Sequence, residues 1–142
     1  SMRIKKLLQL RQERQENFNP HMEVAPSEIT ITSLDEKLIK RAIQYVEENI
    51  GRSELSVEEL SSELGMSRVH LYKKMLSITG KTPVEFIRII RLKRAAQYLR
   101  ESQQTVSEIA YSTGFSNPKY FRKYFKDEFG VLPSDYQERE GK

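Results

Sequence analysis

The sequence predicts an all-α protein of about seven helices, arranged as two helix-turn-helix subdomains joined by a long linker helix. Three features predict this fold: helix-start signals recur along the chain, apolar stripes of helical period follow them, and one block of sequence occurs twice. A chain of 142 residues with 37% hydrophobic residues can form one ordinary core or two small ones. This length excludes a large multidomain enzyme.

The predicted chain has four parts. Residues 1–33 form an N-terminal helical tail and linker, in which Ser1 is read as the remnant of a cleaved tag. The first helix-turn-helix subdomain covers residues 34–80, the linker helix covers 81–101, and the second subdomain covers 102–142. Because Ser1 precedes a start-like methionine, we expect the sequence to be a fragment of a longer protein.

Helix starts are marked by a Ser or Thr that precedes a Glu by three positions, the pattern of a capping box. The pairs are Ser33 with Glu36, Ser56 with Glu59, Thr82 with Glu85, and Thr105 with Glu108. Ser67 and Asn117 are further expected N-caps, and a last short helix is expected to begin near Ser134. The continuous stretch from Pro83 to about Arg100 predicts a helix roughly 27 Å long.

A duplication relates the two subdomains. Val57-Glu58-Glu59-Leu60 aligns with Val106-Ser107-Glu108-Ile109, and Gly65-Met66-Ser67 aligns with Gly114-Phe115-Ser116. The second copy then has one extra residue, after which Gly80 aligns with Gly130 and Pro83 with Pro133. Each copy predicts a short helix, a glycine-containing turn and a second helix. Such a unit can place its second helix in a major groove roughly 12 Å wide, although helical hairpins also serve for packing alone.

Positive charge is concentrated in the second half of the chain. The net charge is +4, from 24 Lys and Arg against 20 Asp and Glu, and the residues from Lys81 onward account for all of it. Lys119, Arg122, Lys123 and Lys126 lie along one predicted helical face. Leu71, Met75, Phe121 and Phe125 are expected to turn inward, into the core. A basic face of this kind is typical of a nucleic-acid contact and also of a solvated surface.

Several chemistries are excluded by the residues. The chain has no cysteine, and His21 and His70 are far apart, so we expect no metal site and no cofactor. The segment Thr79-Gly80-Lys81-Thr82 is similar to the end of a P-loop, but Met75 stands where a P-loop needs glycine. Gly80 is instead expected to be a helix C-cap. We therefore expect no catalytic residues and no enzyme, and the absence of a long apolar segment favours a cytoplasmic protein.

Residues from about Leu34 to Gln137 resemble the DNA-binding domain of AraC/XylS-type bacterial transcription regulators. The positions that carry this resemblance are Arg91-Leu92, Ala95, Leu99, Ile109-Ala110, Gly114-Phe115, Tyr120-Phe121, Lys123, Phe125-Lys126, Gly130, Pro133 and Tyr136. Ser61, Lys73 and Gln137 depart from the family, which often has Ala, Arg and Arg there. The departure at Lys73 matters most, because lysine cannot offer the planar fork with which arginine reads guanine.

The resemblance implies sequence-specific binding of double-stranded DNA by two recognition helices in successive major grooves, for transcription regulation. The residues expected to read base edges are Val69, Tyr72, Lys73, Lys119, Tyr120 and Lys123. The residues expected to contact phosphates are Arg68, Lys74, Arg122 and Lys126, with backbone N–H groups near Ser56 and Thr105. His70 is expected at the rim of this surface or packed beside it.

The first 33 residues resemble the linker that precedes this module in hybrid two-component regulators. That resemblance implies an output module of a larger signalling protein, whose parent is anchored in the inner membrane. The expected partners are double-stranded DNA, RNA polymerase, an upstream receiver or sensor domain, and a second copy in a homodimer. The alternative interpretation is a helical RNA-binding or protein-interaction module, which competition between duplex DNA and duplex RNA distinguishes.

Overall fold

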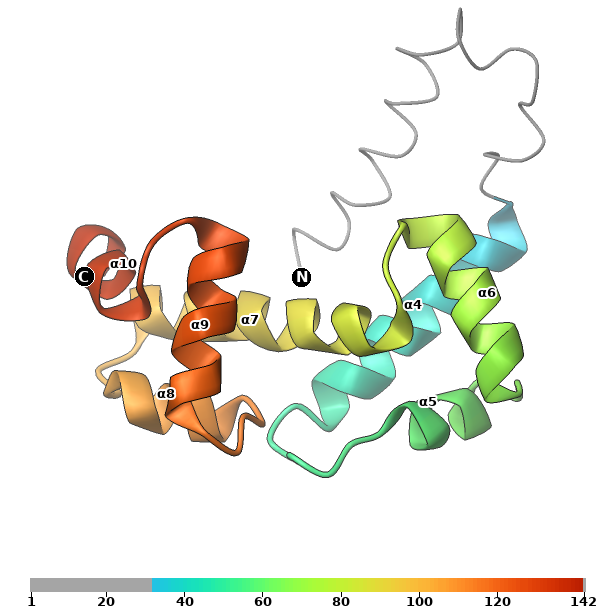
Figure 1. Cartoon of the computed structure of the whole chain (residues 1–142), viewed down its shortest axis with the longest axis horizontal. Helices are drawn as coiled ribbons and strands as arrows, with labels where there is room; N and C mark the ends of the chain where they lie inside the picture. Colours follow the sequence, from blue (N-terminus) through green and yellow to red (C-terminus); the bar gives the residue numbers. More distant parts are fainter. Residues whose placement is uncertain (1–31, 142) are drawn as a thin grey trace, which may run out of the picture. The chain divides into compact units, whose positions relative to one another are not determined.

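The structure is a computed structural model that describes residues 32–141, and within this range it contains seven helices and no strand (Figure 1). The helices are α4 (Ser33–Glu48), α5 (Val57–Glu63), α6 (Arg68–Thr79), α7 (Pro83–Glu101), α8 (Val106–Ser112), α9 (Pro118–Phe129) and α10 (Pro133–Glu140). The all-α prediction is confirmed. The predicted helical tail, with Ser1 and His21, lies outside the described residues.

Two compact units make up the described chain. The first contains residues 32–45 and Ser56–Phe86, and the second contains Val46–Leu55 and residues 87–141. The units are therefore not consecutive in sequence, because the end of α4 and the turn after it belong with the second unit. The predicted parts are consecutive in sequence, whereas each unit of the structure combines two separate segments of the chain.

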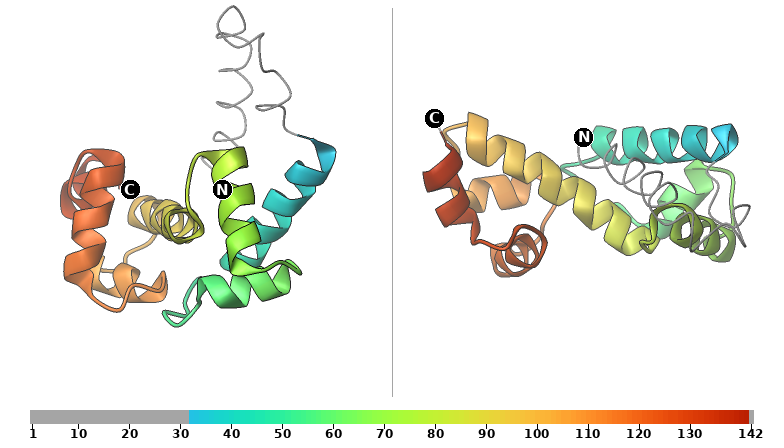
Figure 2. Two further views of the ribbon diagram at one scale, coloured as in Figure 1. Left: turned by 45° about the vertical axis from the view of Figure 1, so that its right-hand side comes forward. Right: turned by 90° about the horizontal axis from the view of Figure 1, so that it is seen from above.

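The duplicated sequence forms two helix pairs of equal lengths. Helices α5 and α8 each have 7 residues, and α6 and α9 each have 12. Gly65 and Gly114 make the turns between the helices of each pair, with φ angles of 69° and 89°. The extra residue of the second copy lies in its turn, because Ser67 caps α6 whereas Asn117 caps α9 one position later relative to the glycine. Figure 2 shows the α8–α9 pair, with α9 lying across the later part of α7.

The predicted capping signals form hydrogen bonds at most helix starts. Thr105 and Glu108 form a complete capping box, and Thr82 and Glu85 bond reciprocally in the same way. Ser56 accepts a hydrogen bond from the backbone N–H of Glu59. Ser67 and Asn117 also cap their helices through their side chains, as expected. Such a cap is worth about 1 kcal/mol, so each helix start is stabilised locally.

The predicted box of Ser33 with Glu36 is wrong by one residue. Thr32 accepts a hydrogen bond from the Asp35 N–H at 3.0 Å, and the Thr32 N–H donates to the Asp35 carboxylate at 3.3 Å. Ser33 is already the first helical residue of α4. Asp35 prevails because its carboxylate is also paired with Lys74 of α6, a contact that local sequence does not reveal.

Each unit has its own apolar core. In the first unit the fully buried side chains include Ile39, Ala42, Leu60, Leu71, Met75 and Phe86. In the second unit the core cluster is Leu92, Ala95, Ala96, Leu99, Ile109, Ala110, Phe115, Phe121 and Phe125. Each large apolar side chain buried in this way contributes about 1.5–3 kcal/mol, so Leu71 and Met75 fix the inward face of α6, and Phe121 and Phe125 fix that of α9. The inward orientation predicted for Leu71, Met75, Phe121 and Phe125 is confirmed.

Arg91 of α7 is buried in the second unit, with 6% of its surface exposed. Its guanidinium donates hydrogen bonds to the carbonyl oxygens of Ile50, Arg52 and Thr113, at 2.6, 2.8 and 2.9 Å. Burial lowers the pKa of Arg91, and the nearby carboxylate of Glu54 opposes this effect. The arginine thus connects the turn after α4 with the turn before α9.

Gly114 lies against this guanidinium. A Cβ atom added there would lie 1.4 Å from Nη1 of Arg91 and 2.5 Å from the Ile50 carbonyl oxygen. Its φ of 89° also disfavours any residue with a side chain. Gly65 has a similar positive φ, but nothing lies within 4 Å of its Cβ position. Glycine is therefore required at position 114 for both conformation and space, and at 65 for conformation alone.

We expect Gly114→Ala to destabilise the protein by more than about 3 kcal/mol, because it displaces a buried charge from its acceptors. Gly65→Ala is the matched control and should cost about 1–2 kcal/mol for its backbone conformation alone. Urea unfolding followed by circular dichroism measures both losses. Equal losses in the two variants would contradict the close packing of Gly114 on Arg91.

Candidate nucleic-acid interface

The outward face of α6 carries the residues predicted to read bases in the first subdomain. Leu71 and Met75 hold the opposite face in the core, so Tyr72 and Lys73 are exposed and Val69 is 64% exposed. These three side chains and Arg68 line a surface depression of about 410 Å³. An exposed valine and tyrosine between two cations make a surface that can meet both apolar and polar groups of a base edge.

The outward face of α9 carries the corresponding residues of the second subdomain. Phe121 and Phe125 are fully buried, whereas Lys119 and Lys123 are exposed and Tyr120 is 57% exposed. The structure therefore presents all three predicted base readers of α9 to solvent.

The predicted phosphate contacts differ in their surroundings. Arg122 and Lys126 are exposed on α9 and make no ion pair with any residue in the range 32–141. Arg68 pairs with Glu58 at 2.6 Å, and both side chains are 61% exposed. An exposed pair of this kind is worth about 0–1 kcal/mol, so Arg68 can exchange Glu58 for a phosphate.

Lys74 lies in a different environment from the other predicted phosphate contacts. Its ammonium is 3.0 Å from the Asp35 carboxylate, which is largely buried at the start of α4. Burial alone raises the pKa of Asp35, but hydrogen bonds from Lys74 and Thr32 outweigh burial and hold the pKa below its usual range. In this structure Lys74 therefore links α6 to α4.

The hydroxyls of Ser56 and Thr105 are both engaged as N-caps. Ser56 accepts from the N–H of Glu59, and Thr105 accepts from the N–H of Glu108, each at 3.1 Å. A phosphate at either position would have to use the remaining backbone N–H groups of the first turn. His70 is exposed near the start of α6, which agrees with a position at the rim.

A contact between α7 and α9 was not anticipated from the sequence. The guanidinium carbon of Arg88 lies 4.1 Å from the centroid of the Tyr124 ring, and the Lys123 ammonium lies 5.6 Å from the same centroid. Both distances are typical of cation–π contacts. A single sequence carries no signal for the contact of Arg88 with Tyr124, because the two residues are on different helices.

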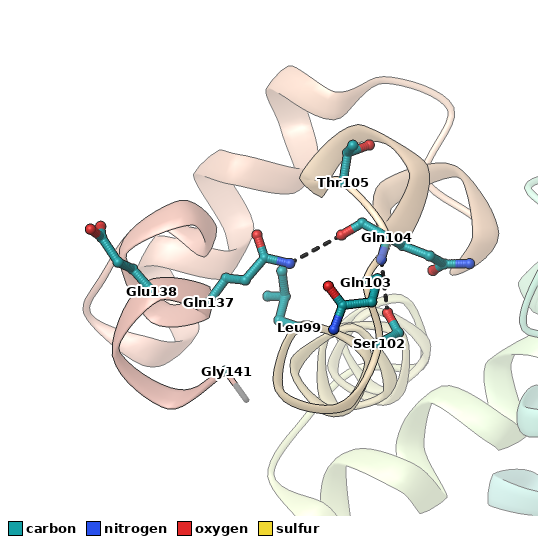
Figure 3. A pocket seen from close by; sticks show the side chains of 8 residues that line it. All are labelled: Leu99, Ser102, Gln103, Gln104, Thr105, Gln137, Glu138 and Gly141. Atoms are coloured by element: carbon teal, nitrogen blue, oxygen red, sulfur yellow. Dashed lines mark hydrogen bonds between the residues drawn. The ribbon is translucent and has the colours of Figure 1, made fainter.

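A second cavity, of about 380 Å³, lies in the second unit beside the end of α7 (Figure 3). Gln137 of α10 donates a hydrogen bond to the Gln104 carbonyl at 3.0 Å across it. The lining contains only one predicted site residue, Thr105. Gln137, at a position where the family often has arginine, therefore connects α10 to the loop before α8 through this hydrogen bond.

Among residues 32–141, no three His, Asp or Glu side chains gather as a metal site requires. None of the helices α4 to α10 is long and apolar enough to cross a bilayer.

Comparisons with known proteins agree on one family. The helix-turn-helix domain family matches residues 60–139. Regulatory protein SoxS of Salmonella typhimurium is 30% identical over 73% of this chain and 96% of its own length. Histidine kinase P4 of Formosa agariphila is 45% identical over 97% of this chain. The chain spans 10% of that kinase and about a third of several operon regulators that it also matches.

Solved structures show the same fold. A probable AraC family transcriptional regulator from Rhodopseudomonas palustris superimposes with a TM-score of 0.65 and 29% identity, over 75% of this chain and 99% of that one. The DNA-binding domain of AdpA, in complex with a target DNA, superimposes with a TM-score of 0.66 and 26% identity. That match covers 72% of this chain and 90% of the AdpA chain.

We expect Asp35→Asn to destabilise the protein at neutral pH by about 1–3 kcal/mol, because it leaves Lys74 without its charged partner. Since folding lowers the pKa of Asp35, its contribution is present above the unfolded pKa and is lost as pH falls through the folded value. The variant should therefore lose less stability than the parent below about pH 4. Urea unfolding across pH 2–7 measures the difference.

Asp127→Asn is the matched control for this experiment, because Asp127 is an exposed carboxylate on α9. It should leave the acid dependence close to that of the parent. Parallel acid curves for Asp35→Asn and the parent would show that the Asp35–Lys74 contact does not stabilise the fold.

Proposed function

This chain belongs to the AraC/XylS-type helix-turn-helix family, and we propose that it binds double-stranded DNA sequence-specifically through α6 and α9. Each helix enters the major groove, at two successive segments of one duplex. The observation that carries the proposal is that both helices bury one apolar face and expose cationic and aromatic side chains on the other. Proteins of this family are transcription regulators, and we infer a regulatory, non-enzymatic role for this chain.

On α6, the proposed base contacts combine apolar and polar groups. Val69 suits the methyl group of thymine, and the ring of Tyr72 adds apolar contact with a hydroxyl at its end. Lys73 donates to guanine O6 or N7 as a point charge without the bidentate fork of arginine. We therefore expect base preference at the Lys73 contact to be weaker than an arginine would provide.

On α9, base reading is assigned to Lys119, Tyr120 and Lys123, which share the exposed face. Arg122 and Lys126, which are also exposed on α9, are assigned to phosphates beside the groove. Arg68 plays the corresponding part for α6 once it leaves Glu58. Lys74, and the backbone N–H groups near Ser56 and Thr105, complete the proposed phosphate contacts.

A role as the output module of a larger signalling protein is supported by the histidine kinase similarity, which covers nearly the whole chain but a small part of the kinase. In such a protein an upstream receiver or sensor domain controls the DNA-binding module. A second copy brought close by dimerisation would raise the local concentration of reading helices at a repeated site. Contact with RNA polymerase belongs to the same proposal.

Selection from a random duplex library at 100 mM salt should enrich two half-sites about one helical turn apart. The spacing follows because two reading helices on one face of B-DNA meet successive major grooves. The enriched duplex then serves as the probe in fluorescence anisotropy.

Duplex RNA of the same sequence is the control competitor. The major groove of A-form RNA is too deep and narrow for side chains to read, so RNA should displace the probe far less effectively than DNA. Equal or stronger competition by RNA would favour an RNA-binding module over the function proposed.

Base and phosphate contacts on α9 can be separated with two alanine variants. Lys123→Ala should reduce discrimination between the selected and a scrambled duplex by about 1–3 kcal/mol. Arg122→Ala, its matched control with the same charge change, should weaken both duplexes equally and lower the salt slope by about one. Anisotropy titrations at several salt concentrations give both quantities. If Lys123→Ala weakened both duplexes equally, its assignment to a base edge would be wrong.

A further inference from the structure

We propose that Arg88 of α7, lying over the ring of Tyr124, forms a phosphate-binding subsite beside α9. This inference rests on the proposed function, because the anion it would bind is a phosphate of the DNA backbone. It adds the linker helix to the elements that contact DNA. The residues predicted from sequence lie on α6 and α9 or at the starts of α5 and α8.

The geometry of Arg88 leaves its polar groups available. Its guanidinium carbon is 4.1 Å from the Tyr124 ring centroid. The ring face attracts the positive charge, but it cannot accept hydrogen bonds from all five N–H donors of the guanidinium. Within residues 32–141, no carboxylate or carbonyl oxygen accepts a hydrogen bond from Arg88, and no ion pair neutralises it. The charge is therefore free to pair with an external anion.

Every other arginine of α7 has a polar partner in the described part of the chain. Arg91 binds backbone carbonyls, Arg94 pairs with Glu47 at 3.1 Å, and Arg100 donates to the Tyr136 hydroxyl at 2.7 Å. Arg88 differs from these three in that its contact is an aromatic ring alone. This contrast separates Arg88 from the arginines that hold the fold together.

A second cation lies at the same ring. The Lys123 ammonium is 5.6 Å from the Tyr124 centroid, so a lysine of the proposed reading face and Arg88 share one aromatic neighbour. Two positive charges near one ring repel each other, and an anion beside them adds an attraction that compensates for this repulsion. A backbone phosphate bound by the planar fork of Arg88 offsets this repulsion and leaves Lys123 to the base edge.

Tyr124 places the subsite at the edge of the reading face. It follows Lys123 directly and lies one helical turn after Tyr120, which is exposed. Its ring is half-buried and packs against the core of the second unit, so its position is fixed. A phosphate on Arg88 would thus belong to a strand that borders the groove entered by α9.

The backbone that carries Arg88 is also held firmly. Its neighbours Ile87 and Ile89 are buried, and Arg91, one turn later, is bound to three carbonyl groups. Because the guanidinium is held over the ring before DNA arrives, little conformational freedom remains to be lost on binding. A contact of this kind sets how deeply α9 enters the groove without reading any base.

The test uses the complete 142-residue chain with Arg88→Met, Arg88→Lys and Arg139→Met. Methionine keeps the packing on Tyr124 and removes the charge, lysine keeps the charge, and Arg139 is an exposed arginine of α10 that controls for net charge. Binding of the selected and the scrambled duplex is measured by anisotropy at several salt concentrations, and thermal unfolding is recorded for each variant.

Arg88→Met should weaken both duplexes by the same factor and reduce the salt slope by about 0.9, the amount for one phosphate. Arg88→Lys should keep most of the slope, and Arg139→Met should change neither quantity. An unchanged slope in Arg88→Met would overturn the proposal and leave Arg88 as a packing residue. A changed ratio between the two duplexes would also overturn it, because that marks a base contact.

Failure of this proposal can be distinguished from failure of the proposed function. If the unaltered chain binds no duplex DNA, both fail together. If it binds the selected duplex and Arg88→Met retains the parental salt slope, only the phosphate subsite fails.

Discussion

The second unit depends on a charge that is buried rather than exposed. Arg91 satisfies its guanidinium with backbone carbonyls from two segments that are distant in sequence, and such a group can be buried only when its acceptors are in place. Those acceptors fix the turn that leads into α9, and the close approach leaves room only for glycine at position 114. The turn before α9, a helix proposed to read DNA, is thereby held in place by α7, which carries no predicted base reader.

The two copies of the repeat secure their second helices differently. In the second unit, aromatic packing among Phe115, Phe121 and Phe125 surrounds the inner face of α9, with ring centroids 5.1 and 5.6 Å apart. In the first unit, α6 is held by Leu71 and Met75 and by the ion pair of Lys74 with Asp35. The two copies thus share helix lengths and a glycine in the turn, while the contacts that anchor each second helix differ.

Local features of the fold were predictable from sequence, and long-range ones were not. Caps, helical period and the inward faces of α6 and α9 depend on residues within one or two turns of each other, so the sequence displays them directly. The start of α4 was misplaced by one residue because Thr32 and Ser33 can both cap, and a contact with Lys74 decides between them. The pairing of Arg88 with Tyr124 joins distant helices, as does the pairing of Arg91 with Ile50. A single sequence contains no record of such pairings.

Val46–Leu55 belongs to the second unit although it precedes most of the first unit in sequence, and this limits how the protein can be divided into fragments. A duplicated motif suggests two modules that could be exchanged or expressed separately. Here the second unit includes the end of α4 and the turn after it. A fragment that begins after residue 55 therefore lacks Ile50 and Arg52, which supply two of the three carbonyl acceptors of Arg91. The smallest continuous segment that keeps the second unit intact therefore begins at Val46, and it necessarily contains the Ser56–Phe86 part of the first unit.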